Sequence, residues 1–324
     1  MAVTWKTSPV DISIGTTGSW TDIDLAALIP LGTTGVILQI VNTSGSGHNV
    51  GWRKNGSGDD RYTNVHKNSV FWVAIGVDAS RIFEMKVANL NVDCYLHGSF
   101  DDDAVFLTNA TFKTAGTGSW LDIDISGDTG GDTAIAAIVE FNVPGASSGL
   151  RENGSTDDRT GNIQHSGGLV SVDGSEIFEV KQSNNQTYLT GYVTKEMTWV
   201  TNAVDVSLSS TGSWINLSAL PAGATGGVVS IHHSGSISSG GLRVDGDSQN
   251  ISDRNNKSLT YGMVKALSLI IEGKIGNTSV NMYRHGHFEE AAAAGWTGKI
   301  IGVTDPAKIS GIAVANIAKV NNVA

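Results

Sequence analysis

The tetrapeptide "TGSW" occurs three times in this chain, at Thr17–Trp20, Thr117–Trp120 and Thr211–Trp214. Its glycine provides the backbone freedom that a tight turn needs, and its serine can form a local hydrogen bond to the backbone. The tryptophan is a large apolar side chain that can anchor the next strand in a core. Because the occurrences are separated by roughly the length of a domain, they predict one turn of a duplicated, domain-sized unit.

Other landmarks occur in the same order in each unit. An arginine stands in "GWRKNG", "GLRENG" and "GLRVDG", and a second one in "DDRYTN", "DDRTGN" and "SDRNNK". Next come "IFEMK", "IFEVK" and "IIEGK", and each unit closes with "CYLHGSF", "TYLTGYV" or "MYRHGHF". This order indicates a tandem duplication. We expect a first, second and third repeat at residues 1–101, 102–196 and 197–290, and a C-terminal assembly or anchoring segment, the tail segment, at residues 291–324.

The pattern of apolar residues within a repeat favours short strands. Val10, Ile12 and Ile14 alternate with polar residues, and "GVILQIV" and "SVFWVAIGV" are almost continuously apolar. The chain has 40 Gly and 5 Pro, a composition typical of short strands joined by tight turns. The expected fold class is all-β, with three tandem antiparallel β-sandwich (jelly-roll-like) repeats and a short apolar C-terminal extension. Since the junctions are short, we expect the three sandwiches to form a semi-rigid rod.

The charge and the N-terminus argue against several classes of partner. With a net charge of −10 at pH 7, the chain repels phosphate backbones and anionic lipid, so no nucleic acid and no membrane is an expected partner. The start, "MAVTWKTSPVD", lacks the charged and apolar regions of a signal peptide, and no apolar run is long enough to span a bilayer. The single cysteine, Cys94, is expected to be a small buried apolar residue.

The motifs predict no catalytic, cofactor-binding or metal-ligating residue. The acidic pairs of "TDID" and "LDID" are expected on a solvated strand face, because the third repeat replaces them. His285 and His287 lie two positions apart on a strand, as zinc ligands often do, but no third ligand is visible, so a local hydrogen bond is favoured for His285.

Six residues that recur among the repeats are expected to have structural roles. The tryptophans of "TGSW" are predicted to pack in the core or between domains, with an exposed platform for sugar as the alternative. The second arginine of each repeat is expected to be oriented by the acidic residue before it, Asp60, Asp158 or Asp253. The six residues are Trp20, Trp120, Trp214, Arg61, Arg159 and Arg254.

Three aromatic residues of the first repeat form a candidate glycan contact. Trp52, Tyr62 and Trp72 have no aromatic counterparts at Leu150 and Thr160 of the second repeat. Aromatic rings at loop ends can stack on sugars. The difference therefore indicates either a specialised glycan-binding repeat or a different packing partner.

The tail segment breaks the pattern of the repeats. Residues 299–324 read "KIIGVTDPAKISGIAVANIAKVNNVA", with a motif of the form Lys-apolar-x-Gly/Asn-apolar at Lys299, Lys308 and Lys319. The segment is too short to form its own core and too apolar to remain in water, so it should dock on a partner, for instance by strand addition. The expected assembly residues are Ile300, Ile301, Val303, Ile309, Ile312, Val314, Ile317 and Val320.

The tail segment resembles the Lys-Ile-x-Gly-Val and Ala-Asn-Ile-Ala-Lys-Val repeats at the ends of tailed-bacteriophage structural proteins. The matching residues are Lys308–Ile312 and Ala315–Val320, whereas Asn322 stands where the pattern has glycine. The stretch "GLRENGSTDDR" also looks like part of a phage virion surface module. The resemblance implies a non-enzymatic virion structural protein, foremost a capsid decoration or cement protein that attaches through its tail.

The same resemblance implies partners and a location. The partners would be the protein itself, as a homo-oligomer for which a trimer is one option, and other virion proteins such as the major capsid protein. The location would be the virion surface, after synthesis in the host cytoplasm without a signal peptide. Two alternatives stay open: a tail or fibre protein that binds host surface glycans, and a carbohydrate-binding accessory module of a polysaccharide-degrading enzyme. No cofactor is implied.

Overall fold

The computed structural model describes residues 3–290 except 114–115, 185, 234–237, 252 and 256–258, together with the backbone of four short strands between residues 299 and 313. The described residues form strands and turns and contain no helix. Consequently no helix in this part of the chain could cross a membrane.

The first repeat contributes eight strands, each bounded by the turns that its Gly, Asn, Asp and Ser residues favour. They are β1 (Val3–Asp11), β2 (Thr21–Asp24), β3 (Gly35–Asn42), β4 (His48–Lys54), β5 (Thr63–Val65), β6 (Ser69–Gly76), β7 (Ile82–Val87) and β8 (Val92–Phe100). They form two four-stranded sheets, ordered β1-β8-β3-β6 and β2-β7-β4-β5.

The third repeat follows the same plan. Its strands are β15 (Met197–Asp205), β16 (Ile215–Asn216), β17 (Ala224–His233), β18 (Ser238–Val244), β19 (Asp253–Asn255), β20 (Leu259–Lys265), β21 (Ile271–Ile275) and β22 (Val280–Glu289). Their sheets are ordered β15-β22-β17-β20 and β16-β21-β18-β19.

The second repeat differs because one long strand serves both of its sheets. Its strands are β9 (Ala104–Lys113), β10 (Leu121–Asp124), β11 (Ala136–Glu152), β12 (Gly161–Ser171), β13 (Ile177–Gln182) and β14 (Thr187–Val193). The 17-residue β11 pairs with β14 through its first half and with β13 through its second half, while β12 pairs along both halves.

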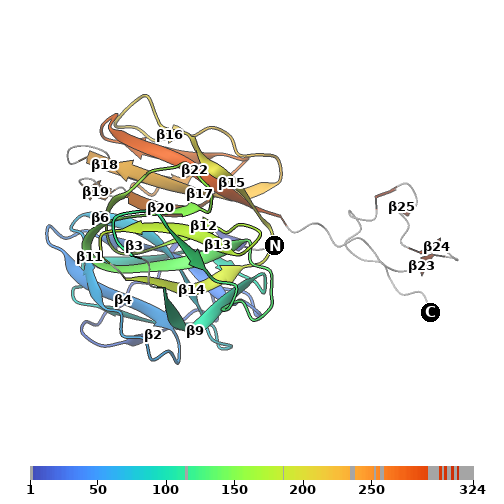
Figure 1. Ribbon diagram of the computed structural model, residues 1–324, viewed down its shortest axis with the longest axis horizontal. Coiled ribbons are helices and arrows are strands. Elements are labelled where there is room, and N and C mark those ends of the chain that lie inside the picture. The colour runs from blue at the N-terminus through green and yellow to red at the C-terminus, as the bar shows by residue number, and fades with distance from the viewer. Residues whose placement is uncertain are drawn as a thin grey trace.

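The three repeats together form the body of the molecule, and their sheets do not form a row of separate sandwiches. Six small sheets are organised as a six-bladed β-propeller, so the expected three tandem β-sandwich (jelly-roll-like) repeats are wrong. In Figure 1 the strands of the third repeat lie at the top of the body and β2, β4 and β9 lie at the bottom, with β12 and β13 between them. Period-two alternation predicts which strand faces are apolar, but it does not determine which sheet covers each face.

One apolar core extends through all three repeats, which overturns the expected rod. This core cluster includes Trp72 of the first repeat, Ile138 of the second and Val229 of the third. The equivalent strands β6, β12 and β20 contact one another in all three pairings. Tyr261 of the third repeat reaches into the second, where its hydroxyl lies 2.7 Å from Leu150 N and 3.2 Å from Leu150 O.

Glycines allow aromatic rings of one repeat to lie directly on the strands of another. A Cβ added to Gly35 of the first repeat would lie 2.2 Å from the ring of Phe106 in the second. A Cβ added to Gly226 of the third repeat would lie 2.3 Å from the indole of Trp5 in the first. These two glycines therefore permit approaches that any other residue would block.

The tail segment forms short hairpins of its own. β23 (Lys299–Ile300) pairs with β24 (Val303–Thr304), and β25 (Lys308–Ile309) pairs with β26 (Ile312–Ala313). Each hairpin coincides with one of the Lys-apolar-x-Gly-apolar motifs in the sequence.

Candidate functional site

The loop that carries "NGSGDDR" in the first repeat contacts the first strand of the second repeat. Asn109 Oδ1 accepts hydrogen bonds from the hydroxyl of Ser57 at 3.0 Å and from Gly58 N at 2.8 Å. The backbone N–H of Ala110 donates to Asp59 Oδ2 at 2.8 Å. We name residues 55–61, and their equivalents 153–159 in the second repeat, the contact loops.

The second contact loop repeats this geometry against the third repeat. Asn202 Oδ1 lies 3.0 Å from the hydroxyl of Ser155 and accepts from Thr156 N at 2.9 Å. Ala203 N donates to Asp157 Oδ2 at 2.8 Å. Each contact loop is thus a connector between successive repeats, and the carboxylates of Asp59 and Asp157 are bound to protein partners.

The arginine at the end of each contact loop also reaches the next repeat. Arg61 donates from Nε and Nη2 to the two carboxylate oxygens of Glu140, at 2.8 and 3.0 Å, and its guanidinium lies 4.8 Å from the ring centroid of Tyr188. In the second loop the guanidinium of Arg159 lies 4.0 Å from the ring centroid of Tyr283.

The expected aspartate partners of Arg61 and Arg159 are wrong, because each arginine pairs with the aspartate one position earlier in the sequence. Asp59 forms the ion pair with Arg61 at 2.8 Å, and Asp157 forms the one with Arg159. Asp60 accepts instead from the indole N–H of Trp20 at 2.9 Å. Adjacent residues of a turn point in different directions, which sequence order alone does not reveal. The side chains of Asp253 and Arg254 lie outside the described residues.

A buried histidine completes the network around Glu140. His165 Nε2 lies 2.7 Å from Glu140 Oε1, and Nδ1 lies 2.7 Å from the carbonyl oxygen of Val50. Both partners are hydrogen-bond acceptors, so each ring nitrogen of His165 lies within hydrogen-bonding distance of an oxygen. The ring stacks on Trp52, with centroids 3.9 Å apart and planes 22° apart.

Opposite charges are paired in this network. The cation of Arg61 faces the anions of Glu140 and Asp59, and the ring of His165 lies against Glu140. Burial would raise the pKa of Glu140, but the charges and hydrogen bonds of Arg61 and His165 outweigh burial and lower it. The network therefore joins the first and second repeats through paired charges.

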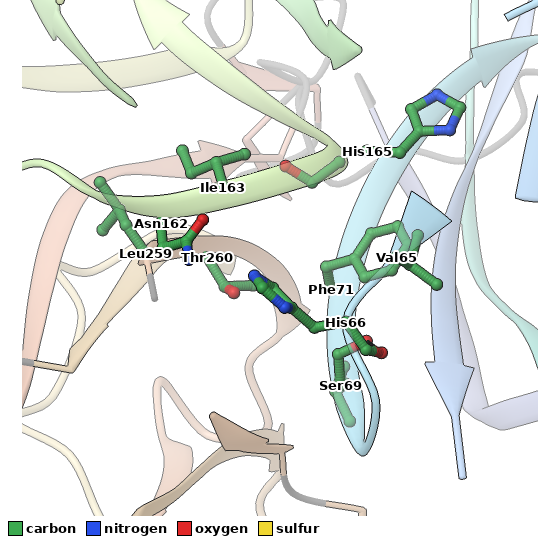
Figure 2. Close-up of a pocket in the computed structure, with 11 residues that line it drawn as sticks. Val65, His66, Ser69, Phe71, Asn162, Ile163, His165, Leu259 and Thr260 are labelled. Carbon is green, nitrogen blue, oxygen red and sulfur yellow. Dashed lines mark hydrogen bonds between the residues drawn. The ribbon is translucent and has the colours of Figure 1, made fainter. Parts of the chain in front are cut away.

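A small cavity lies beside His165 where all three repeats meet (Figure 2). Its volume is about 20 Å³, and its lining includes Phe71 of the first repeat, Ile163 of the second and Leu259 of the third. That space holds about one water molecule, so it is too small for a substrate.

The three tryptophans of "TGSW" form the same arrangement in every repeat, with cations over each half-buried indole. Each indole N–H donates to an oxygen of Asp60, Asp158 or Asn250, at 2.9, 2.7 and 2.9 Å respectively. The guanidinium carbons of Arg53, Arg151 and Arg243 lie 4.2, 4.3 and 4.5 Å from the ring centroids of Trp20, Trp120 and Trp214. These contacts occupy the rings within the protein and leave little face for a sugar.

The proposed glycan contact does not form an exposed platform. Trp52 and Trp72 are 1% and 0% exposed, and both belong to the apolar core. Tyr62 lies under the ammonium of Lys86 at 4.4 Å from the ring centroid. Strand periodicity cannot distinguish a buried tryptophan from an exposed one when both faces of the strand are covered.

The equivalent residues His97, Thr190 and His285 are the extra residues of three β-bulges. Each bulge residue has a hydrogen-bonding partner. His97 Nε2 lies 3.2 Å from Gln39 Oε1, and His285 Nε2 lies 2.9 Å from Ser230 Oγ. The Thr190 hydroxyl donates to Ile138 O at 3.1 Å. His287 lies beside Glu289 instead, at 3.3 Å. Cys94 is fully buried, and burial first, then Asp11 and Asp93, raises its pKa.

An acidic cluster lies where the junctions between repeats meet. One carboxylate oxygen from each of Asp101, Asp103 and Glu196 lies within 4.8 Å of the other two. Lys195 forms an ion pair with Asp103. Acidic groups with protein partners of this kind do not by themselves constitute a metal site.

The tail segment can be compared with its prediction only at the backbone. Ile300, Val303, Ile309 and Ile312 belong to the two hairpins, whose side chains are outside the description. Ile301, Val314, Ile317 and Val320 lie entirely outside the described residues.

Several partners of the contact loops were not found by sequence reasoning, including Asn109, Glu140 and Asn202. A usable signal was present for two of them, because the tripeptide "TNA" recurs at Thr108–Ala110 and Thr201–Ala203. Glu140 had no such signal, because it is not repeated. It pairs with Tyr188, and the residues that pair with the equivalent tyrosines of the first and third repeats are Gln39 and Ser230.

Comparisons with known proteins assign no family. No family model matches the chain, and no curated protein matches it. One solved structure, the N-terminal CBM22-1-CBM22-2 tandem domain from Paenibacillus barcinonensis Xyn10C, aligns over 90% of this chain and 94% of its own, at 11% identity and a TM-score of 0.15. At that TM-score the likeness carries no argument about fold or function.

Proposed function

We propose that this chain is a non-enzymatic structural protein of a tailed-bacteriophage virion, foremost a capsid decoration or cement protein. In this proposal the β-propeller body is a rigid, acidic unit, and the tail segment joins it to other molecules of the chain and to the particle.

The observation that carries the proposal is that the four short strands of the tail segment pair only with one another. β23 pairs with β24 and β25 with β26, and neither hairpin belongs to a sheet of the body. A pair of two-residue strands is too small to be stable in water on its own. The hairpins are therefore suited to docking on another surface, as the apolar sequence of the motifs also indicates.

The body supports the proposal because the arginines that recur in its repeats form ion pairs within the protein. The first arginine of each repeat, Arg53, Arg151 or Arg243, pairs with a glutamate of its own sheet at 2.7–2.8 Å. The second arginines of the first two repeats hold neighbouring repeats together. The arginines that recur among the repeats thus make the body rigid, and a component of a particle needs a rigid body.

The test is the solution mass of the full chain and of a chain ending at Glu290, by light scattering. We expect an oligomer for the full chain and a monomer for the truncated one. In parallel, an antibody to the body should label purified virions of the phage that encodes the chain. The same oligomeric state for both proteins would contradict the proposal, and so would unlabelled particles.

A further inference from the structure

Two adjoining cavities form a groove beside the junction of the first and second repeats. One, of about 380 Å³, is lined by Thr4 and by residues within 30–33 and 99–102. The other, of about 320 Å³, is lined by Lys54 and by residues within 33–34, 77–79 and 102–106. Thr33 and Asp102 line both, so the two cavities adjoin, and together we name them the junction groove.

Hydrogen bonds fix the floor of the junction groove. Thr34 N donates to Phe100 O at 3.0 Å, and the Thr34 hydroxyl lies 2.6 Å from Asp101 O and 2.7 Å from Ala104 O. Lys54 Nζ donates to Phe106 O at 3.1 Å. Because these bonds hold the backbone on both sides, the groove exists before any partner arrives.

The junction groove combines an apolar side chain with acidic charge. Leu31 is 84% exposed, more than any other large apolar side chain among the described residues. Three acidic residues, Asp78, Asp101 and Asp102, line the groove against a single lysine, Lys54, which already donates to Phe106. A suitable ligand presents an apolar side chain next to a cation.

The tail motifs have this chemistry. In each motif a lysine directly precedes a branched apolar residue, at Lys299-Ile300, Lys308-Ile309 and Lys319-Val320. Residues 299–324 contain these three lysines and a single acidic residue, Asp305. The charge of the tail segment is therefore opposite in sign to that of the groove.

We propose that the junction groove receives a tail motif of a second molecule of this chain, with the lysine beside Asp102 and the apolar residue against Leu31. The inference rests on the proposed function, because it names the surface on which the tail segment assembles. Each molecule carries both a groove and a tail, so the contact is head-to-tail and joins molecules into a ring or a row.

Cysteine cross-linking between two variants tests the contact, since the native Cys94 is fully buried. Leu31→Cys is mixed with size-tagged Ile309→Cys under mild oxidation, and the mixed disulfide is measured on a non-reducing gel. The control is Leu90→Cys with the same partner, because Leu90 is also apolar and 53% exposed. We expect about tenfold more mixed dimer for Leu31→Cys than for the control.

A charge exchange provides the second readout. Asp102→Lys is expected to weaken self-association about tenfold, and Lys308→Glu to weaken it as well, whereas a mixture of the two variants should recover part of the loss. Asp102 is exposed, so its replacement should leave the fold intact, which the thermal midpoint checks.

The outcomes separate the groove from the proposed function. If truncation at Glu290 abolishes assembly but Leu31→Cys cross-links no better than Leu90→Cys, the tail assembles elsewhere and the groove is wrong. If Leu31→Cys and Ile309→Cys in one chain form only an intramolecular disulfide, the tail occupies its own groove, which also overturns the inference. If truncation leaves the oligomeric state unchanged, the proposed function itself fails.

Discussion

At the scale of single residues, the network around Glu140 is the most consequential feature. Arg61 and His165 both depend on this one carboxylate, and its side chain is 2% exposed. Removing one member of a buried ion network is costly, because a remaining charge then has too few partners and no water to replace them.

Glu140→Gln should therefore lower the free energy of unfolding by about 3–5 kcal/mol, measured by urea denaturation. The matched control is Asp158→Asn, because Asp158 pairs with Lys181 but its side chain is 66% exposed. An exposed pair of this kind contributes about 0–1 kcal/mol. A similar small loss for both variants would show that the network contributes little.

Buried histidines give a prediction of the pH dependence. Burial lowers the pKa of His97 to about 3 and that of His285 to about 4, from 6.5. As the pH falls below about 6.5, the unfolded chain gains protons that the folded chain does not, so stability is lost from there towards the folded pKa values. Each histidine should contribute a slope of about 1.4 kcal/mol per pH unit.

Comparing the wild type with a His97→Gln, His285→Gln variant isolates this effect. The free energy of unfolding is measured by chemical denaturation between pH 6 and pH 5, where the carboxylates are still mostly ionised. It should fall less steeply with decreasing pH for the variant than for the wild type. Parallel stability curves would mean that the two imidazoles are already protonated in the folded state.

At the scale of the strands, sequence reasoning was successful for local structure and failed for partners. The segment "IFEMK" is β7, and "TGSW" precedes β2, as turn chemistry and alternation predicted. Arg61 and Glu140, by contrast, are 79 positions apart and contact each other only because two repeats pack side by side. The burial of Trp52 and Trp72 likewise depends on which sheet covers them, and local periodicity carries no information about that.

The ring of Phe106 lies directly against the strand at Gly35, and this contact can be tested by substitution. Gly35→Ala would place a Cβ 2.2 Å from Phe106, so we expect a loss of about 1–3 kcal/mol in unfolding free energy. Gly15→Ala is the control, since a Cβ there meets nothing within 4 Å. Adding Phe106→Leu to Gly35→Ala should restore part of the loss; no recovery would place the strain elsewhere.

At the scale of the whole molecule, the continuous core predicts one cooperative transition. Residues from all three repeats share a single apolar cluster, and β6, β12 and β20 contact one another. Separating one repeat would expose that cluster to water. Differential scanning calorimetry of the full chain should give one peak, with calorimetric and van't Hoff enthalpies in agreement. Three resolved peaks would instead indicate independently folding repeats.

The contact loops explain why the interfaces between the repeats do not depend on protein concentration. Each loop joins a repeat to its successor, as three separate subunits of a ring would be joined, but here the partners are parts of one chain. A ring of separate identical subunits would dissociate at low concentration and would carry the same residue at every interface. The fused chain keeps its interfaces at any dilution, and Glu140 can stand in one repeat while Gln39 and Ser230 stand in the others.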